Sequence, residues 1–403
     1  MMDRSKSGAY QLSVLNLPAE WDDSRLRSSW AELTEKSQNI NALYNSSVWF
    51  DLLRARHKPE DLAIAVARDA SGALVGIAPI LFKDHPFQYY VSRYPIITRH
   101  LKAAHVLGSV PMFPTDSQVY TQLVDALLTV NVDCVYMDTV PTDHPFTKSA
   151  TATWKRTHLV YAPGGARPWH LRQIPSTCEE YLSLMSSKTK STLRKKAKKL
   201  AQSLGGELEI VRVDRAHQVR DFLAQAVKVS RNSWQHQFLG SRLDDSDDER
   251  AWGERVAGAG LLRSYLLKAG ERPCAFVVGY QFNCVYHYVE LGYDRELSEH
   301  SPGTILLHML IQDLCDHKRP ATLNFGMGDG DYKRRFGNVQ IEDVSIIILR
   351  KTLRNYFLIR SHALLRYLVS VLKGIKMKWK AKNAEGQTQS NKRLNIAVSA
   401  LDR

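Results

Sequence analysis

The stretch VYHYVEL at residues 285–291, with the loop and helix that follow it, decides the fold of this chain. Its aromatic and β-branched residues predict a β-strand. The sequence then passes through a short polar loop to Ser301-Pro302-Gly303-Thr304, where a strongly apolar helix is expected to begin. The backbone N–H groups and the dipole of such a helix start attract an anion such as a diphosphate, although Ser-Pro-Gly is also an ordinary joint between loop and helix.

Side chains along the predicted strand supply two candidates for a general base. Because side chains alternate along a strand, we expect Tyr286, Tyr288 and Glu290 on one face and His287 on the other. Glu290 is the first choice and His287 the second, since a carboxylate or a neutral imidazole can take the proton of an attacking amine. Each also fits an ordinary role, Glu290 as the partner of a lysine and His287 as a core histidine.

A glycine-rich segment, GMGDGD at residues 326–331, follows a strand expected at 321–325. It does not complete a dinucleotide-binding loop, because Asp331 stands where GxGxxG requires its last glycine and no helix pattern opens there. The chain also lacks GxxxxGK[ST], GxSxG and HExxH motifs, which disfavours P-loop NTPases, α/β-hydrolases and zincins. In the YKRRFG that follows, Lys333 is placed to meet a phosphate or an oxyanion.

Basic residues outnumber acidic ones by 14, and they gather in two places. Residues 188–199 carry seven basic residues and no acidic one, and residues 350–403 carry thirteen basic and two acidic residues. Such an excess indicates anionic partners, meaning phosphates, nucleic acid or an acidic membrane surface. The first group lies on a helix predicted over residues 176–204, capped by Ser176 and ended by Gly205, where it can equally be a solvated face.

The two halves of the chain carry a similar pattern. Residues 1–170 predict an α/β unit that contains two apolar runs at 61–82 joined by Asp-Ala-Ser-Gly, which is a hairpin signal. Residues 266–278 repeat this strand, turn and strand. We therefore expect α/β domains in tandem, with mixed sheets flanked by helices, at 1–170 and 171–350, and a basic amphipathic helix with a flexible tail at 351–403.

The composition is that of an ordinary globular protein, with 44% hydrophobic and 24% charged residues, which excludes collagen-like and wholly disordered chains. The five cysteines are never closer than ten residues, so neither a disulfide framework nor a CxxC metal site is expected. The N-terminus lacks the apolar core of a signal peptide, and no run of about 18 apolar residues occurs. These features predict a soluble cytoplasmic protein without a metal.

The chain resembles the GNAT acyltransferases of the CelD/BcsL type in four motifs: Trp234 at the end of a helix, LGYD at 291–294, SPGT at 301–304 and YKRRFG at 332–337. That group is associated with bacterial cellulose and exopolysaccharide biosynthesis. It is related in fold to the Fem-type aminoacyl transferases with their tandem GNAT domains. The resemblance covers residues 175–350 best.

The resemblance implies transfer of an acyl group from acetyl-CoA, or another acyl-CoA, to an amine or hydroxyl of a sugar or polysaccharide precursor. The thioester is expected between the strands at 285–293 and 321–325. Residues 300–305 match the phosphate loop of the family, but they keep only its first glycine, and Ile305 is expected to crowd the diphosphate. The implied site residues are Glu290, His287, Lys333 and Tyr332 for catalysis, His300, Ser301, Gly303 and Thr304 for the cofactor, and Arg231, Trp234 and Tyr288 for the acceptor.

Two other functions stay open. One is a Fem-type aminoacyl transferase that uses charged tRNA, with the basic helix around residues 188–199 binding the RNA. Apart from that case the sequence does not indicate nucleic acid, because aromatic residues do not interleave with the basic runs. The other is a non-catalytic accessory module of a polysaccharide synthesis system.

The C-terminal segment has an amphipathic pattern of its own. Leu353, Phe357, Leu364, Leu368 and Ile375 recur at helical intervals among arginines and lysines. Such a helix can rest on the anionic inner leaflet of a membrane and make the protein peripheral there. It can also pack on the preceding domain as an ordinary last helix.

Overall fold

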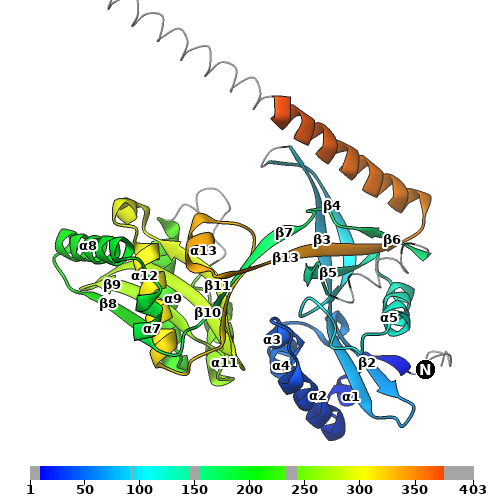
Figure 1. The fold of residues 1–403 in the computed structure, drawn as a ribbon. Coiled ribbons are helices and arrows are strands. Elements are labelled where there is room, and N and C mark those ends of the chain that lie inside the picture. The colour runs from blue at the N-terminus through cyan, green and yellow to red at the C-terminus, as the bar shows by residue number, and fades with distance from the viewer. Residues whose placement is uncertain are drawn as a thin grey trace, which may run out of the picture.

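The chain forms an α/β structure around one mixed sheet of 13 strands, with helices on both of its faces (Figure 1). The computed structural model describes residues 10–91, 94–144, 147, 155, 157–232 and 243–375. The strand order is β1-β2-β3-β4-β5-β13-β7-β12-β11-β10-β9-β8, and β6 lies beside β13. The predicted fold class, α/β with mixed sheet flanked by helices, is confirmed.

The first half of the sheet is built from an antiparallel meander followed by a parallel strand. Its strands β1 to β4 pair antiparallel in sequence order, and β5 then pairs parallel with β4 after a crossover through α5. In chain order its elements are β1 (Tyr10–Leu15), α1 (Pro18–Trp21), α2 (Ser24–Lys36), α3 (Ala42–Asn45), α4 (Ser47–Arg54), η1 (Pro59–Asp61), β2 (Leu62–Asp69), β3 (Leu74–Val91), β4 (Tyr94–Val106), α5 (Ser117–Thr129) and β5 (Cys134–Pro141).

The second half repeats this order. Its strands β8 to β11 pair antiparallel, and β12 pairs parallel with β11 after a crossover through α12. Its elements are β8 (Leu208–Val213), α9 (Ala216–Arg231), α11 (Asp247–Gly258), β9 (Ser264–Ala269), β10 (Arg272–Phe282), β11 (Val285–Tyr293), η2 (Arg295–His300), α12 (Pro302–Asp316) and β12 (Thr322–Met327). The hairpins recognised in the sequence are β2–β3 and β9–β10, so the predicted tandem arrangement is confirmed by the shared topology.

The two halves exchange strands with each other. β7 (Arg167–Gln173) follows the first repeat along the chain but pairs with β12 of the second repeat. β13 (Val339–Arg350) follows the second repeat and pairs with β5 of the first, while also pairing with β7 and with β6 (His158–Tyr161). Because each half contributes a strand to the sheet of the other, the two repeats form one continuous sheet.

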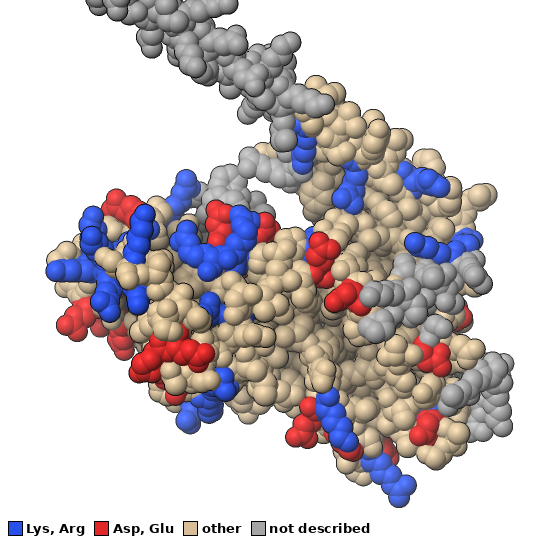
Figure 2. Space-filling model, viewed as in Figure 1, with Lys and Arg blue, Asp and Glu red and all other residues tan. Residues whose placement is uncertain are grey.

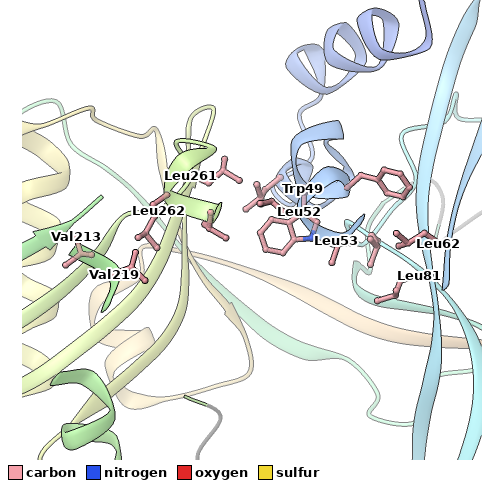
Figure 3. Close-up of a cluster of buried hydrophobic side chains, with 14 of the residues drawn as sticks. Trp49, Leu52, Leu53, Leu62, Leu81, Val213, Val219, Leu261 and Leu262 are labelled. Atoms are coloured by element: carbon pink, nitrogen blue, oxygen red, sulfur yellow. The ribbon is translucent and has the colours of Figure 1, made fainter. Parts of the chain in front are cut away.

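A hydrophobic core also joins the two halves. The Trp49 ring of α4 meets Trp252 of α11 edge to face at 5.6 Å and lies 5.6 Å from Tyr280 of β10. In Figure 3, Trp49, Leu52 and Leu53 of α4 lie between Leu261 and Leu262 of the second half and the strands of the first half that carry Leu62 and Leu81. Aromatic pairs of this kind contribute about 0.5–1.5 kcal/mol beyond the area they bury. The packing therefore fixes the orientation of the halves on the face of the sheet that carries α4 and α9.

The single helix predicted over residues 176–204 is two helices, α7 (Cys178–Ser183) and α8 (Ser187–Leu204). The break occurs because the hydroxyl of Ser186 accepts a hydrogen bond from the Thr189 N–H at 3.1 Å and so caps a new helix start. The predicted end is right, since Gly205 ends α8 with a φ of 67°.

Two details of the predicted helix ends are wrong. The N-cap of α7 is Thr177 rather than Ser176, whose N–H instead donates to the Glu180 carboxylate at 2.8 Å. A short helix, α13 (Asp331–Phe336), follows the glycine-rich loop, where the sequence pattern predicted none. Six residues are too few to establish a helical period in the sequence.

After β13, residues 353–375 form a last helix, and the rest of the predicted C-terminal tail lies outside the described residues. Among the helices that the structure describes, none is both long and apolar enough to cross a bilayer.

A buried arginine anchors the C-terminal end of α12. The Arg263 side chain is 4% exposed, and it donates to the Asp313 carboxylate at 2.9 Å and to the Tyr265 hydroxyl at 2.7 Å. It also reaches the His317 carbonyl oxygen at 2.8 Å. These bonds tie the helix to β9 and thereby fix where its other end, at Ser301–Thr304, lies.

Replacing this arginine is expected to destabilise the fold. Arg263→Leu removes the buried cation that pairs with the Asp313 carboxylate and donates to the Tyr265 hydroxyl, and we expect a loss of about 3–5 kcal/mol in the free energy of unfolding. Arg212→Leu is the matched control, because Arg212 donates to the same carboxylate at 3.1 Å but is 35% exposed, and should cost less than about 1 kcal/mol. Urea unfolding measures both, and equal losses would contradict the assignment.

Candidate active site

The site begins where two parallel strands diverge. β11 and β12 share only three pairs, Val285 with Thr322, Tyr286 with Leu323 and His287 with Asn324. β11 then continues to Tyr293, and β12 continues to Met327, without further pairing between them. A V-shaped gap therefore opens between the carboxyl ends of the two strands, which is where ligands bind in open α/β sheets.

A β-bulge distorts β11 at the mouth of this gap. Gly279 of β10 pairs with Tyr288, whereas its neighbour Val278 pairs with Glu290, so Val289 is an extra residue. The Val289 side chain is 48% exposed although both neighbouring strands are largely buried.

The bulge places Glu290 on the face of the sheet opposite to the one predicted. Tyr286 and Tyr288 share one face of the sheet, as predicted, and pack there in the core beside α12. Glu290 instead lies opposite Val278, whose side chain packs on the other face of the sheet, the face that His287 shares with Tyr44. The prediction that Glu290 shares a face with the two tyrosines is wrong, because an extra residue inverts the alternation.

A cleft of about 690 Å³ opens from this point between the two halves of the molecule. It brings together five of the predicted site residues: His287, Tyr288, Glu290, Tyr332 and Lys333. Its lining from the first half consists of Asn41, Tyr44, His105, Leu107, Gly108, Ser109, Asp138 and Thr139. A ligand in the cleft would therefore touch both repeats.

His287 is buried in the cleft wall. Its side chain is 3% exposed, its ring meets Tyr44 edge to face at 5.5 Å, and its Nε2 has no hydrogen-bond partner among the described residues. Burial lowers the pKa of His287 to about 4, so the imidazole is neutral at neutral pH. A neutral imidazole can accept a proton, but the low pKa of His287 means that this imidazole is a weak base.

Lys333 sits on the opposite side of the gap. It is 8% exposed, and its Nζ donates to the carbonyl oxygens of Met327 at 2.6 Å and Gly326 at 3.3 Å. The amine closes the glycine-rich loop and keeps a third N–H bond for the cleft. Burial lowers the pKa of Lys333 to about 8, although the carboxylates of Asp329 and Asp343 oppose the shift.

Two tyrosines pack beside this lysine. The Tyr288 and Tyr332 rings lie 6.0 Å apart, and Phe325 of β12 lies 5.7 Å from Tyr288. Burial raises the pKa of both phenols above the ordinary value, so both hydroxyl groups stay protonated and can donate hydrogen bonds.

A chain of polar side chains crosses the floor of the cleft. The Trp169 indole donates to the Asn324 side-chain oxygen at 2.6 Å, and the Asn324 amide donates to Asn41 at 3.2 Å. The Asn41 amide donates to the Ser109 hydroxyl at 2.5 Å, which lies 2.6 Å from the Thr139 hydroxyl. This chain links β7 and β12 to the first repeat.

Two members of this chain have unusual backbones. Ser109 has a φ of 71° and Thr139 a φ of 51°, in the left-handed region that residues other than glycine rarely adopt. Such residues cost about 1–3 kcal/mol each and persist where the surroundings hold them. The backbone strain therefore lies in the first-half wall of the cleft.

The predicted cofactor loop lies at the start of α12, next to the splayed part of β11. A Cβ on Gly303 would lie 3.2 Å from Leu291 Cδ2, and Leu291 itself lines the cleft. Ser301, with a φ of 55°, accepts a hydrogen bond from Lys196 of α8 at 2.7 Å. The loop is thus adjacent to the cleft lining at Leu291.

The other predicted loop residues have partners of their own. His300 Nε2 lies 3.1 Å from the Glu299 carboxylate, and the Thr304 N–H donates to the Ser301 carbonyl at 3.0 Å. Ile305 is 2% exposed and packs in the core below α12, so it does not crowd the outer side of the loop as the sequence suggested.

One predicted acceptor residue on α9 does not join the cleft. Arg231 is exposed at the end of α9 and does not line the cleft. Trp234 lies outside the described residues. Sequence reasoning also missed the whole first-half wall, including Asn41, Ser109 and Asp138, since no motif marks these residues.

The comparisons with known proteins agree with this geometry. Residues 187–334 match the model of a family described as an acetyltransferase (GNAT) domain. This match covers the splayed strands, the start of α12 and the lysine of the cleft, so this part of the second half is similar to a GNAT-type acetyltransferase domain. No curated protein matches the sequence.

Solved structures share the fold over most of the chain. The crystal structure of FemX is 12% identical, with a TM-score of 0.56 over 83% of this chain and 98% of FemX. A conserved protein of unknown function from Bacteroides thetaiotaomicron is 12% identical, with a TM-score of 0.50 over 81% of this chain and 97% of that one. At this identity the similarity concerns the fold alone.

The buried amine of the cleft gives the first test of the site. Lys333 is expected to react with an amine-modifying reagent with a midpoint near pH 8, because its burial favours the neutral, nucleophilic form. A lysine peptide added as an internal standard should have its midpoint near the ordinary value of about 10.4. Mass spectrometry of the labelled digest measures both midpoints, and a Lys333 midpoint above pH 10 would show that the amine is solvated and not part of a closed cleft.

Proposed function

We propose that the protein is an acyltransferase that moves an acyl group from coenzyme A to an acceptor bound in the cleft between its two halves. Acetyl is the acyl group that we propose first. The observation that carries this proposal is the gap between β11 and β12, which opens at a bulge onto that cleft. The GNAT-type domain over residues 187–334 supports it.

The donor is assigned to the gap and to the start of α12. The pantetheine arm would lie between the diverging strands, and the diphosphate would lie at Ser301–Gly303. Because the Thr304 N–H is already bonded, the anion would depend on the backbone at Gly303, on the helix dipole and on the ammonium group of Lys196. Lys196 would supply the positive charge for the diphosphate, since Gly303 offers only backbone groups.

The transfer requires a base for the acceptor proton, a group that stabilises the oxyanion, and protonation of the leaving thiolate. The acceptor nitrogen or oxygen forms a bond to the thioester carbonyl carbon and gives up its proton, and the C–S bond breaks to release CoA as a thiolate that must be protonated. Glu290 and His287, which the bulge brings to one face, are the candidates for taking the acceptor proton. General base catalysis typically increases the rate by about 10²–10⁴-fold. The backbone at Val289 and the ammonium form of Lys333 are the candidates for stabilising the oxyanion and the thiolate.

The first-half wall is assigned to the acceptor. Asn41, Ser109 and Thr139 present amide and hydroxyl groups to the cleft, and Asp138 presents a carboxylate. Such groups hydrogen-bond hydroxyl-rich or amine-bearing molecules. Together with the resemblance to the CelD/BcsL type, this chemistry supports a sugar or polysaccharide precursor as the acceptor.

A second candidate function is aminoacyl transfer from charged tRNA, in the manner of the Fem-type transferases. The observation that favours it is the outer surface of α8, where Lys and Arg gather beside the candidate donor loop (Figure 2). Lys188, Arg194, Lys195, Lys198 and Lys199 are exposed there, and none has an ion-pair partner within the part of the chain that the structure describes. The shared fold with FemX is compatible with this alternative.

Binding of acetyl-CoA should stabilise the protein. Because a ligand that binds only the folded state adds RT ln(1 + [L]/Kd), acetyl-CoA at about 100 times its Kd should add about 2.7 kcal/mol, measured as a rise in Tm. Gly303→Trp should remove the rise, since even a Cβ there meets Leu291 at 3.2 Å. The matched control is Gly258→Trp on α11, where a Cβ meets nothing within 4 Å.

The pattern of ligand effects separates the alternatives. A rise with acyl-CoA in the wild type and in Gly258→Trp, but not in Gly303→Trp, supports the acyl-CoA assignment. A rise with charged tRNA alone, lost steeply with salt, supports the Fem-type alternative. No rise with any of these ligands contradicts both and leaves a non-catalytic accessory module.

A further inference from the structure

The last helix, residues 353–375, is held to the first half by one face only. The Tyr89 hydroxyl of β3 donates to the Leu358 carbonyl at 3.2 Å, and the Tyr161 hydroxyl of β6 lies 2.6 Å from His362 Nδ1. His362 Nε2 reaches the Gln88 carbonyl at 3.2 Å. The helix is therefore fixed on the protein and does not depend on its apolar stripe for attachment.

The apolar stripe recognised in the sequence points outward. Leu353 is 92% exposed, Phe357 75%, Leu364 58% and Ile375 58%. The exposed large apolar residues of this helix are Leu353, Tyr356, Phe357, Leu364, Tyr367, Leu368, Val371, Leu372 and Ile375. Soluble proteins rarely leave so many such side chains together in water unless the surface is used.

The end of the long β3–β4 ribbon carries a second exposed apolar group. Tyr90, Val91, Tyr94, Ile96 and Ile97 are between 42% and 61% exposed. The ribbon end lies beside the helix, since Gln88 and Tyr89 on β3 are the residues that bond to it (Figure 1). We call the helix stripe and these five residues together the docking surface.

The charges around the docking surface have one sign. Neither residues 85–115 nor residues 344–384 contain a single Asp or Glu, and the described helix carries Arg354, Arg360, Arg366 and Lys373. In Figure 2 the upper part of the molecule, where the helix and ribbon lie, is largely uncharged with separate basic side chains and no acidic ones.

We propose that the docking surface binds the interface of an anionic lipid membrane, with the helix lying in the plane of that interface. A partner of opposite charge fits the acid-free surroundings, and lipid headgroups above acyl chains fit a mixture of basic, aromatic and aliphatic side chains. The helix does not meet the requirements for crossing the bilayer, which agrees with binding at the interface. The inference is independent of the proposed acyl transfer.

The length of the surface fits this occupant. A helix of 23 residues is roughly 34 Å long, and it offers apolar side chains along its whole length rather than a single anchor point. Each Lys or Arg near an anionic leaflet adds roughly fivefold in affinity, so four of them reinforce the apolar contact.

Vesicle binding by the full chain tests the proposal. The wild type should float with phosphatidylcholine vesicles that contain 30% phosphatidylserine and much less with phosphatidylcholine alone. Phe357→Ser with Leu364→Ser should weaken binding to the anionic vesicles at least tenfold, as should Arg354→Gln with Lys373→Gln. All four positions are exposed, so the variants should keep the melting temperature of the wild type.

Two further variants complete the design. Tyr94→Ser with Ile96→Ser removes the ribbon part of the docking surface and should also weaken binding several-fold. Leu184→Ser is the matched control, because Leu184 is 64% exposed on the second half, far from the helix along the chain, and its loss should leave binding unchanged.

Three results would overturn the proposal. The first is a wild type that does not bind anionic vesicles. The second is binding that survives both helix variants, which would assign the affinity to another part of the chain. The third is a dimer in solution that Phe357→Ser with Leu364→Ser dissociates, which would make the docking surface an interface between two copies.

Discussion

The early divergence of β11 from β12 is the constraint on which the rest of this structure depends. After three pairs the facing edges of the two strands no longer bond to each other, in the middle of a sheet of 13 strands. Backbone groups at such an edge need partners from side chains, water or a ligand. The bulge at Val289, the start of α12 and the buried amine of Lys333 all border this gap. A thioester arm bound in the gap would extend the sheet across it.

The first repeat contributes a wall and a frame. It has the same strand order as the second repeat, but it lines the cleft with polar side chains such as Asn41 and Ser109, which are hydrogen-bonded to each other. The exchange of β7 and β13 and the packing around Trp49 keep that wall opposite the gap. The halves therefore line one cleft together, while the last helix adds a surface directed away from it.

The sequence predicted the parts of the fold that local patterns encode. The β2–β3 and β9–β10 hairpins, the α12 start and the glycine that ends α8 follow from turn and cap chemistry. The bulge escaped prediction because Val289 fits the alternation of an ordinary strand, and only its register against Gly279 reveals the extra residue. The first-half wall escaped because Asn41, Ser109 and Thr139 are far apart in sequence and meet only through tertiary packing.

Hydrogen–deuterium exchange with a non-transferable acyl-CoA analogue tests the central claim most directly. We expect new protection in peptides that cover 287–291 and 301–305, together with 324–333, because these segments border the gap. Peptides on the exposed face of the last helix should not change. Protection confined to the first repeat, or to the outer face of α8, would contradict the assignment of the donor to the gap between β11 and β12.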